Sequence, residues 1–160
     1  LQKPGALEVL AASTVPVCLM HMRGEPDNMQ NQPVYKNVLL EVQLFLQDRI
    51  DACLQAGIER NRIIIDPGFG FGKNLNHNLE LLNRLYEFKP LELPLLIGIS
   101  RKRMLGAITG KNEKERLAAG VAAGVMALMQ GVSIIRTHDV AETIDAVKLF
   151  QAVRDQTLMQ

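Results

Sequence analysis

Four short runs of apolar, strand-forming residues recur along the chain, and a stretch with helical periodicity separates each run from the next. The four runs are 15–20, 62–66, 95–100 and 133–138. Each run is nearly continuous in apolar residues rather than alternating, which is typical of parallel strands buried on both faces. Strands and helices that follow one another in this order predict repeated βα units and a parallel sheet.

Apolar residues at steps of three and four mark the helices of these units. The longest pattern covers 39–53, and Gly57 then supplies a C-terminal stop. Before the last pattern, Asp139 and Glu142 have the spacing of a capping box with Asp139 at the cap. The remaining helical patterns cover 5–12, 79–85, 117–128 and 144–150.

The composition excludes several classes of protein. There are 18 Lys and Arg against 17 Asp and Glu, which gives a net charge of +1. This charge does not indicate a basic surface that would bind nucleic acid or an anionic membrane. An apolar content of 48% with so little net charge excludes disorder. The longest apolar stretch, 117–129, is shorter than the ~18 to 20 residues of a membrane span. We expect Cys18 and Cys53 to be buried thiols in a reducing compartment, the cytoplasm.

Two architectures fit 160 residues with four βα units. One is a small open, doubly wound sheet, and the other is half of a (β/α)8 barrel, which needs about 250 residues. Residues 1–4 have the character of a loop rather than of a chain start, which favours a fragment. A long polar loop is expected over 22–34.

Polar side chains follow three of the predicted strands at the point where each strand ends. Asp66 follows an Ile-Ile-Ile run, Ser100 and Lys102 follow the next strand, and Arg136 and His138 follow the last. Ligands bind at the carboxyl ends of parallel strands both in open α/β sheets and in barrels. The sequence therefore predicts one pocket at this end of the sheet.

Spacing indicates what this pocket binds. Arg136 and His138 lie two residues apart and share one face of a strand, which suits a phosphate or diphosphate group. The alternative is that Arg136 only pairs with Asp139. Asp66 needs a partner at the end of an apolar strand. That partner is either Lys102 or a planar heterocycle that donates two N–H groups, and spacing does not choose between them.

A glycine-rich segment, 68–74, follows Asp66 but does not match a phosphate-binding P-loop. Three residues rather than four separate Gly68 from Gly72, and Asn rather than Ser or Thr follows Lys73. We expect the glycines to let the backbone approach a ligand, with Phe69 or Phe71 as an apolar wall and Lys73 in solvent.

Two other readings of the polar residues are weak. Ser100, His138 and Asp66 have the residue types of a catalytic triad, but Ser100 lacks the flanking glycines of a nucleophile elbow. His21, at a strand end between two methionines, is expected to be a structural histidine.

Taken in this order, the strand-end motifs resemble bacterial dihydropteroate synthases. The motifs are Met20-His-Met22, Asp66-Pro-Gly-Phe-Gly-Phe-Gly-Lys73, Ser100-Arg-Lys102 and Arg136-Thr-His-Asp-Val140. The resemblance implies a (β/α)8 TIM barrel, of which residues 1–160 form a single domain with strands five to eight and their helices. It also implies that the N-terminal half of the barrel lies outside this sequence.

Members of this family join 6-hydroxymethyl-7,8-dihydropterin diphosphate to 4-aminobenzoate and release diphosphate in folate biosynthesis. The resemblance implies that Asp66, Lys102, Met20 and Gly98 bind the pterin and that Arg136 and His138 bind the diphosphate. It implies that Phe71, Ser100 and Lys102 border the aminobenzoate site, where sulfonamides also bind. Lys102, Arg136 and His138 would be the catalytic residues.

The resemblance further implies Mg²⁺, whose ligand comes from the family's N-terminal part, so that no metal ligand is expected in this chain. It favours a cytoplasmic homodimer that associates through the helix over 117–129. The expected functional protein carries about 100 or more further N-terminal residues, and the 160 residues alone are expected to be inactive. The alternatives are a pterin-binding methyltransferase barrel and a non-catalytic paralogue or fragment that binds pterin or phosphate.

Overall fold

The computed structural model describes residues 3–24 and 33–156. Of the predicted polar loop over 22–34, residues 25–32 lie outside the described part. The α-helices and strands, in chain order, are α1 Ala6–Ala11, β1 Val17–Met20, α2 Val38–Gln55, β2 Ile63–Asp66, α3 Leu75–Asn83, β3 Leu96–Ile97, α4 Arg103–Thr109, α5 Leu117–Met129, β4 Ile134–Ile135 and α6 Val140–Asp155. The 3₁₀ helices are Arg60–Arg62, Leu85–Leu91 and Glu113–Glu115.

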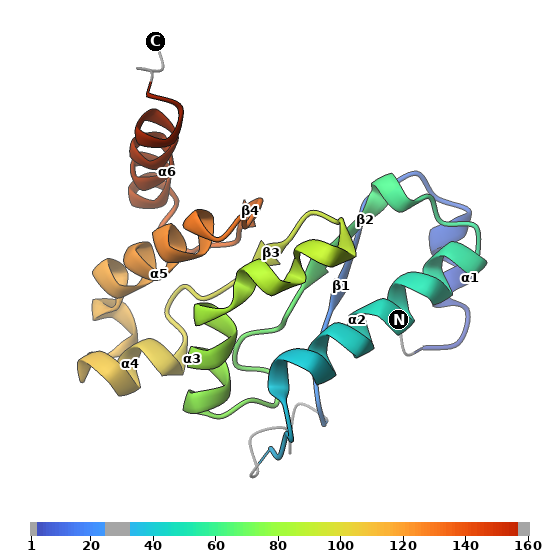
Figure 1. Ribbon diagram of the computed structural model, residues 1–160, viewed down its shortest axis with the longest axis horizontal. Coiled ribbons are helices and arrows are strands. Elements are labelled where there is room, and N and C mark those ends of the chain that lie inside the picture. The colour runs from blue at the N-terminus through green and yellow to red at the C-terminus, as the bar shows by residue number, and fades with distance from the viewer. Residues whose placement is uncertain (1–2, 25–32, 157–160) are drawn as a thin grey trace.

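All four strands are parallel, and they lie side by side in the order in which they occur in the chain (Figure 1). Val17 pairs with Ile63 and Met20 with Asp66, which fixes the register of β1 on β2. Leu96 pairs with Ile134 between β3 and β4. A single bridge from Ile65 to Leu95 joins the two pairs of strands. This confirms the predicted repeated βα units and parallel strands.

The two faces of the strands differ in burial. Val17, Leu19, Ile63 and Ile65 point to one face and are at most 4% exposed, because they share a core with the apolar side of α2. On the other face Met20, Ile64, Leu96 and Ile134 are only partly buried. The expectation of two buried cysteines is wrong for Cys18, which lies on this second face and is exposed, whereas Cys53 on α2 is buried.

Helix α2 follows the predicted periodicity closely. Its buried stripe contains Leu39, Val42, Leu46, Ile50 and Cys53, as expected from their spacing of three and four. The side chain of Asn37 caps the helix by accepting a hydrogen bond from the backbone N–H of Leu40. No helix in the described parts of the chain is long and apolar enough to cross a membrane.

One helix and one helix cap differ from the expectation. Helix α4 was not predicted, because it is short and buries only Met104 and Leu105. Asp139 does precede α6, but its side chain makes no capping hydrogen bond, so the predicted capping box is wrong. The reason is that the Asp139 carboxylate is bound to Arg101 at 2.6 Å.

Candidate functional site

The carboxyl ends of β3 and β4 bring Arg136 and His138 to the same side of the sheet. A Cβ atom placed on Gly98 would lie 2.9 Å from a terminal nitrogen of Arg136, so the guanidinium group occupies the space that this glycine leaves open. Two residues further on, Nδ1 of His138 lies 3.0 Å from Oγ of Ser100. Both side chains are therefore directed toward the same face of the neighbouring β3 segment, as the spacing predicts.

Arg136 does not pair with Asp139. Asp139 instead accepts hydrogen bonds from Arg101, and this ion pair holds the pKa of the Asp139 carboxyl below its ordinary value. Among the described residues, Arg136 forms no ion pair with a carboxylate within 4 Å. A guanidinium group without a carboxylate, at a strand end beside an imidazole, is suited to bind an external anion.

Asp66 ends β2 as a buried carboxylate with 3% of its surface exposed. One carboxylate oxygen accepts a hydrogen bond of 2.7 Å from the backbone N–H of Gly68. Burial raises the pKa of Asp66, while that hydrogen bond and the positive charges of Arg136, Lys73 and Lys102 act in the opposite direction. Within the described part of the chain no salt bridge joins Asp66 to Lys102, so the structural pairing considered from the sequence is not formed.

Lys102 and Phe71 meet although they follow different strands. The ammonium nitrogen of Lys102 lies 4.2 Å from the centre of the Phe71 ring, a cation–π contact. Burial lowers the pKa of Lys102, and the nearby charge of Arg136 lowers it further, against the effect of Asp66. Phe71 is therefore placed as an apolar wall beside a cation, which is one of the two alternatives expected. Phe69 is 1% exposed and belongs to the core.

Two glycines of the segment 67–73, here called the glycine turn, lie in close contact with neighbouring backbone. Gly68 and Gly72 have φ angles of +71° and +64°, which favour glycine. A Cβ atom on Gly68 would lie 1.9 Å from the carbonyl oxygen of His21, and one on Gly72 would lie 2.2 Å from that of Arg23. The expectation that these glycines admit a ligand is therefore wrong for these two positions, since they lie against the backbone that leaves β1.

Lys73 is not in solvent, so that expectation is also wrong. Its side chain is 2% exposed, and its ammonium nitrogen lies 2.9 Å from Gly68 O, 3.1 Å from Phe71 O and 2.8 Å from Nδ1 of His21. Burial lowers the pKa of Lys73 to about 7. Burial, followed by the charge of Lys73, lowers the pKa of His21 to about 3, so this histidine is a neutral, buried and structural one as predicted.

The turn after β3 depends on Arg101, a cation of the Ser-Arg-Lys motif, and on Arg116, which the sequence did not single out. Arg101 has a φ angle of +59°, which is unfavourable for a residue with a side chain. Its ion pair with Asp139 fixes the side chain, and Arg116 donates a hydrogen bond of 2.9 Å to the Arg101 carbonyl. Arg101 thus connects Ser100 and Lys102 in a conformation that turns both of them toward the site. Only its place inside the Ser-Arg-Lys motif pointed to it.

The part of the chain that the structure describes has no group of three His, Cys, Asp or Glu side chains arranged to hold a metal ion. A cavity of about 460 Å³ lies between the glycine turn and α4, and Gly70, Lys73, Asn78, Lys102 and Met104 are among its lining residues.

Comparisons with known proteins show the family to which the chain belongs. The sequence matches the family described as "Pterin binding enzyme" over residues 1–138. It is 50% identical over 152 residues to the dihydropteroate synthase of Escherichia coli strain K12, covering 95% of this chain and 54% of that protein. It is 46% identical over 152 residues to the Haemophilus influenzae enzyme, covering 95% of this chain and 55% of that protein. The chain thus spans about half the length of the curated relatives it matches.

Solved structures show the same similarity. The Yersinia pestis dihydropteroate synthase, solved as a sulfonamide drug complex, has a TM-score of 0.95 at 48% identity over 98% of this chain and 57% of that one. The Xanthomonas albilineans enzyme, solved in complex with 7,8-dihydropteroate, has a TM-score of 0.89 at 44% identity over 96% of this chain and 57% of that one. With a family match over most of its length and relatives at 50% identity, this chain belongs to the pterin binding enzyme family and has the α/β fold of the dihydropteroate synthases.

Proposed function

We propose that this chain carries the pterin- and diphosphate-binding part of a dihydropteroate synthase. In this proposal its four strands are strands five to eight of a (β/α)8 barrel, and the site lies at their carboxyl ends. The observation that carries the proposal is a buried Asp66 carboxylate at a strand end on which the charges of Arg136 and Lys102 act, with His138 two residues beyond Arg136. A pterin diphosphate needs an acceptor for its ring N–H groups and cations for its phosphates.

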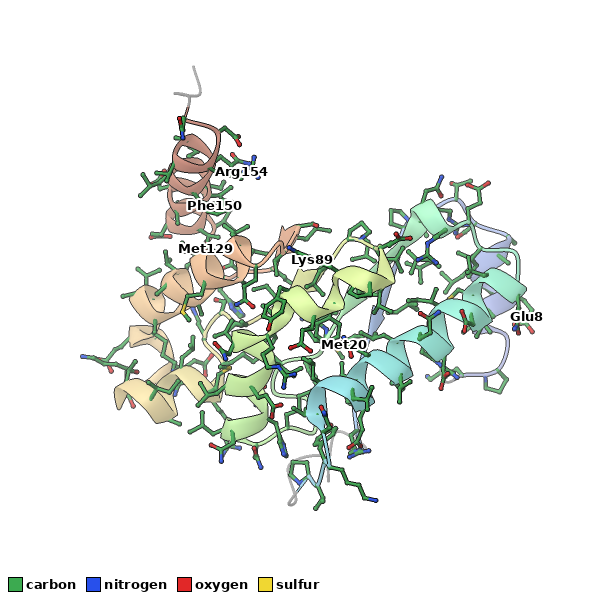
Figure 2. All side chains as sticks on the ribbon, in the orientation of Figure 1. Glu8, Met20, Lys89, Met129, Phe150 and Arg154 are labelled. Carbon is green, nitrogen blue, oxygen red and sulfur yellow. The ribbon has the colours of Figure 1, made fainter. Side chains whose placement is uncertain are left out.

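Asp66 is proposed to bind the amino-pyrimidine edge of the pterin. A carboxylate has about four acceptor positions, and the hydrogen bond from Gly68 occupies one of them. Met20, which pairs with Asp66 across β1 and β2, and Gly98 would line the ring pocket. Met20 lies in the central part of the molecule (Figure 2).

Arg136 and His138 are proposed to bind the diphosphate. In the reaction the amine nitrogen of 4-aminobenzoate bonds to the pterin methylene carbon while the carbon–oxygen bond to diphosphate breaks. The electron pair leaves with diphosphate, and the amine loses a proton. Arg136 and His138 would stabilise the charge that develops on the leaving group. The aromatic amine is nucleophilic as it stands, so the step needs orientation more than a strong base.

The second substrate is proposed to lie beside Phe71, Ser100 and Lys102. The contact between the Lys102 ammonium group and the Phe71 ring joins an apolar surface to a positive charge, which suits the ring and the carboxylate of 4-aminobenzoate. Solved relatives support 4-aminobenzoate and sulfonamides as ligand classes, because one was solved with 4-aminobenzoic acid and another with a sulfonamide drug. Sulfonamides are therefore proposed as inhibitors of this protein.

Magnesium remains part of the proposal, and its ligand is expected to come from outside this sequence. The described residues offer no cluster that fits the ion, so no step of the reaction is assigned to it here. A cytoplasmic location is also proposed.

A homodimer through the C-terminal helices is a further part of the proposal. Helices α5 and α6 border a groove of about 1570 Å³ whose apolar lining includes Val125, Met129, Ile144 and Phe150. Met129 on α5 is 73% exposed, and Figure 2 shows it close to Phe150 on α6. An apolar surface of this kind favours a subunit contact.

The proposal is tested by titrating the purified protein with 6-hydroxymethylpterin in a calorimeter. Wild type is expected to bind, and Asp66→Asn is expected to lose binding because the amide presents a donor to the ring's own donors. Lys114→Met, which changes an exposed residue, is the control. Wild-type affinity in Asp66→Asn would contradict the assignment. Binding of pterin but not of its diphosphate would favour the methyltransferase-type alternative.

A further inference from the structure

Four side chains bind the backbone of the glycine turn, and one of them, Lys73, belongs to the turn itself. Asp66 accepts from Gly68 N, and the buried Asn78 accepts from Gly70 N at 2.8 Å. Tyr35 donates to Gly72 O at 2.8 Å. The last side chain is that of Lys73, which folds back under the turn from its C-terminal end. Of these residues, only Asp66 has a part in the proposed chemistry.

The three hydrogens of the Lys73 ammonium group have three acceptors. Two are the carbonyl oxygens of Gly68 and Phe71, and the third is Nδ1 of His21 at 2.8 Å. His21 is itself fixed, because its backbone N–H donates to Asp66 O at 3.0 Å and its ring packs edge-on against Phe45. Lys73 thus binds three parts of the site. They are Gly68, whose N–H group binds the Asp66 carboxylate, Phe71, whose ring contacts Lys102, and His21, which directly follows β1.

We propose that Lys73 is a positioning residue of this site, and that its ammonium group holds the glycine turn in the conformation that places Asp66 and Phe71. The proposal rests on the function proposed above and deepens it. Through Gly68, Lys73 sets the N–H group that binds the Asp66 carboxylate. Through Phe71, it sets the ring that contacts Lys102.

The burial of Lys73 distinguishes a positioning role from that of a solvated surface charge or a catalytic group. With 2% of its surface exposed, Lys73 is not a solvated charge, and its ammonium nitrogen already has three acceptors within 3.1 Å inside the protein. The charged groups that act on its ammonium group are Asp66, Arg23 and Lys102, while the ring of His21 accepts one hydrogen bond in its neutral form. A neutral hydrocarbon side chain of similar length would fill the same space without binding either carbonyl.

The test compares Lys73→Met with wild type in two measurements on the purified protein. The first is backbone hydrogen exchange over 67–73 without ligand, and the second is calorimetric affinity for 6-hydroxymethylpterin. In Lys73→Met, exchange in the glycine turn is expected to rise by about tenfold or more while exchange in β2 and α2 stays unchanged. Pterin affinity is expected to fall by about tenfold or more because the carboxylate is displaced.

Two controls separate positioning from loss of stability or of charge. Lys114→Met changes an exposed lysine in the same way and is expected to leave both readouts unchanged. Ile50→Val weakens the core beneath the C-terminal half of α2 and is expected to lower stability without changing pterin affinity. An equal loss of affinity in Ile50→Val and Lys73→Met would overturn the proposal.

A second variant keeps the proposal testable where Lys73→Met does not fold. His21→Phe retains the ring contact with Phe45 and removes the acceptor, so exchange over 67–73 is expected to rise less than in Lys73→Met. Unchanged exchange in the glycine turn of either folded variant would overturn the proposal. A different outcome is that exchange over 67–73 rises in Lys73→Met but wild type does not bind pterin. That result would support the role of Lys73 in holding the glycine turn and would overturn the proposed function.

Discussion

The glycine turn after β2 and the turn after β3 both deliver residues to the same site, but different forces hold them. The glycine turn is buried, and its backbone is fixed by Lys73 and Asn78 and by close contact with residues 21–23. The turn after β3 is partly exposed, and an ion pair between Arg101 and Asp139 fixes it. Packing and buried hydrogen bonds depend little on salt, whereas exposed ion pairs are screened. The two turns are therefore expected to respond differently to substitution, pH and salt.

The largest expected effect is a substitution in the glycine turn. Gly68→Ala combines a positive φ angle with a Cβ atom 1.9 Å from a backbone oxygen, so the free energy of unfolding is expected to fall by about 3 kcal/mol or more. Gly110 is the matched control, because it has a φ angle of +70° and nothing within 4 Å of a Cβ atom. Gly110→Ala is expected to lose about 1 to 2 kcal/mol. Chemical denaturation measures both losses, and equal losses would contradict the close contact with His21.

The next effect is the pH dependence that Lys73 gives to the glycine turn. Its pKa is about 7 in the folded protein, below its ordinary value, so the unfolded chain binds the proton more tightly. The stability cost of charging Lys73 is therefore fully present below pH 7 and is relieved as the pH rises. Between about pH 7 and pH 8.5 the unfolding free energy of wild type should rise relative to Lys73→Met, approaching about 1.4 kcal/mol per pH unit.

The raised pKa values of Cys18 and Cys53 add a change of the opposite sign at higher pH in both proteins. This shared contribution cancels in the difference between them. Denaturation curves of wild type and Lys73→Met at each pH give the difference directly. Parallel pH profiles for the two proteins would contradict a buried ammonium group at this position.

The smallest expected effect concerns the turn after β3. Asp139→Asn removes the ion pair with Arg101, whose side chain is 33% exposed. A partly exposed pair contributes little, so the loss of stability should be smaller than that of Gly110→Ala. It should also shrink in about 0.5 M salt because the wild-type pair is screened there. Thermal unfolding at low and high salt is the measurement. A loss of stability that does not change with salt would show that the Asp139 ion pair is not screened, and would contradict the difference between the two turns.

The same difference explains what could be predicted from the sequence. The strands, the buried stripe of α2 and the shared face of Arg136 and His138 follow from periodicity, which is local. The burial of Lys73 depends on the backbone of residues 21–23, some 50 positions earlier, which no local pattern reports. The ion-pair partner of Asp139 could not be predicted from local sequence either. Both Arg101 and Arg136 are near the site, and only the three-dimensional path of the turn brings Arg101 to Asp139.

The most direct test of the account concerns Arg136, since the central claim is that the strand ends bind a pterin diphosphate. Calorimetry should compare the affinities of wild type and Arg136→Ala for 6-hydroxymethylpterin and for its diphosphate. Arg154→Ala, at an exposed position of α6, is the control. Loss of a charge-assisted contact should weaken diphosphate binding by about 1.5 to 3 kcal/mol and leave free pterin binding nearly unchanged. Equal losses for the two ligands would remove Arg136 from the diphosphate site and contradict the account.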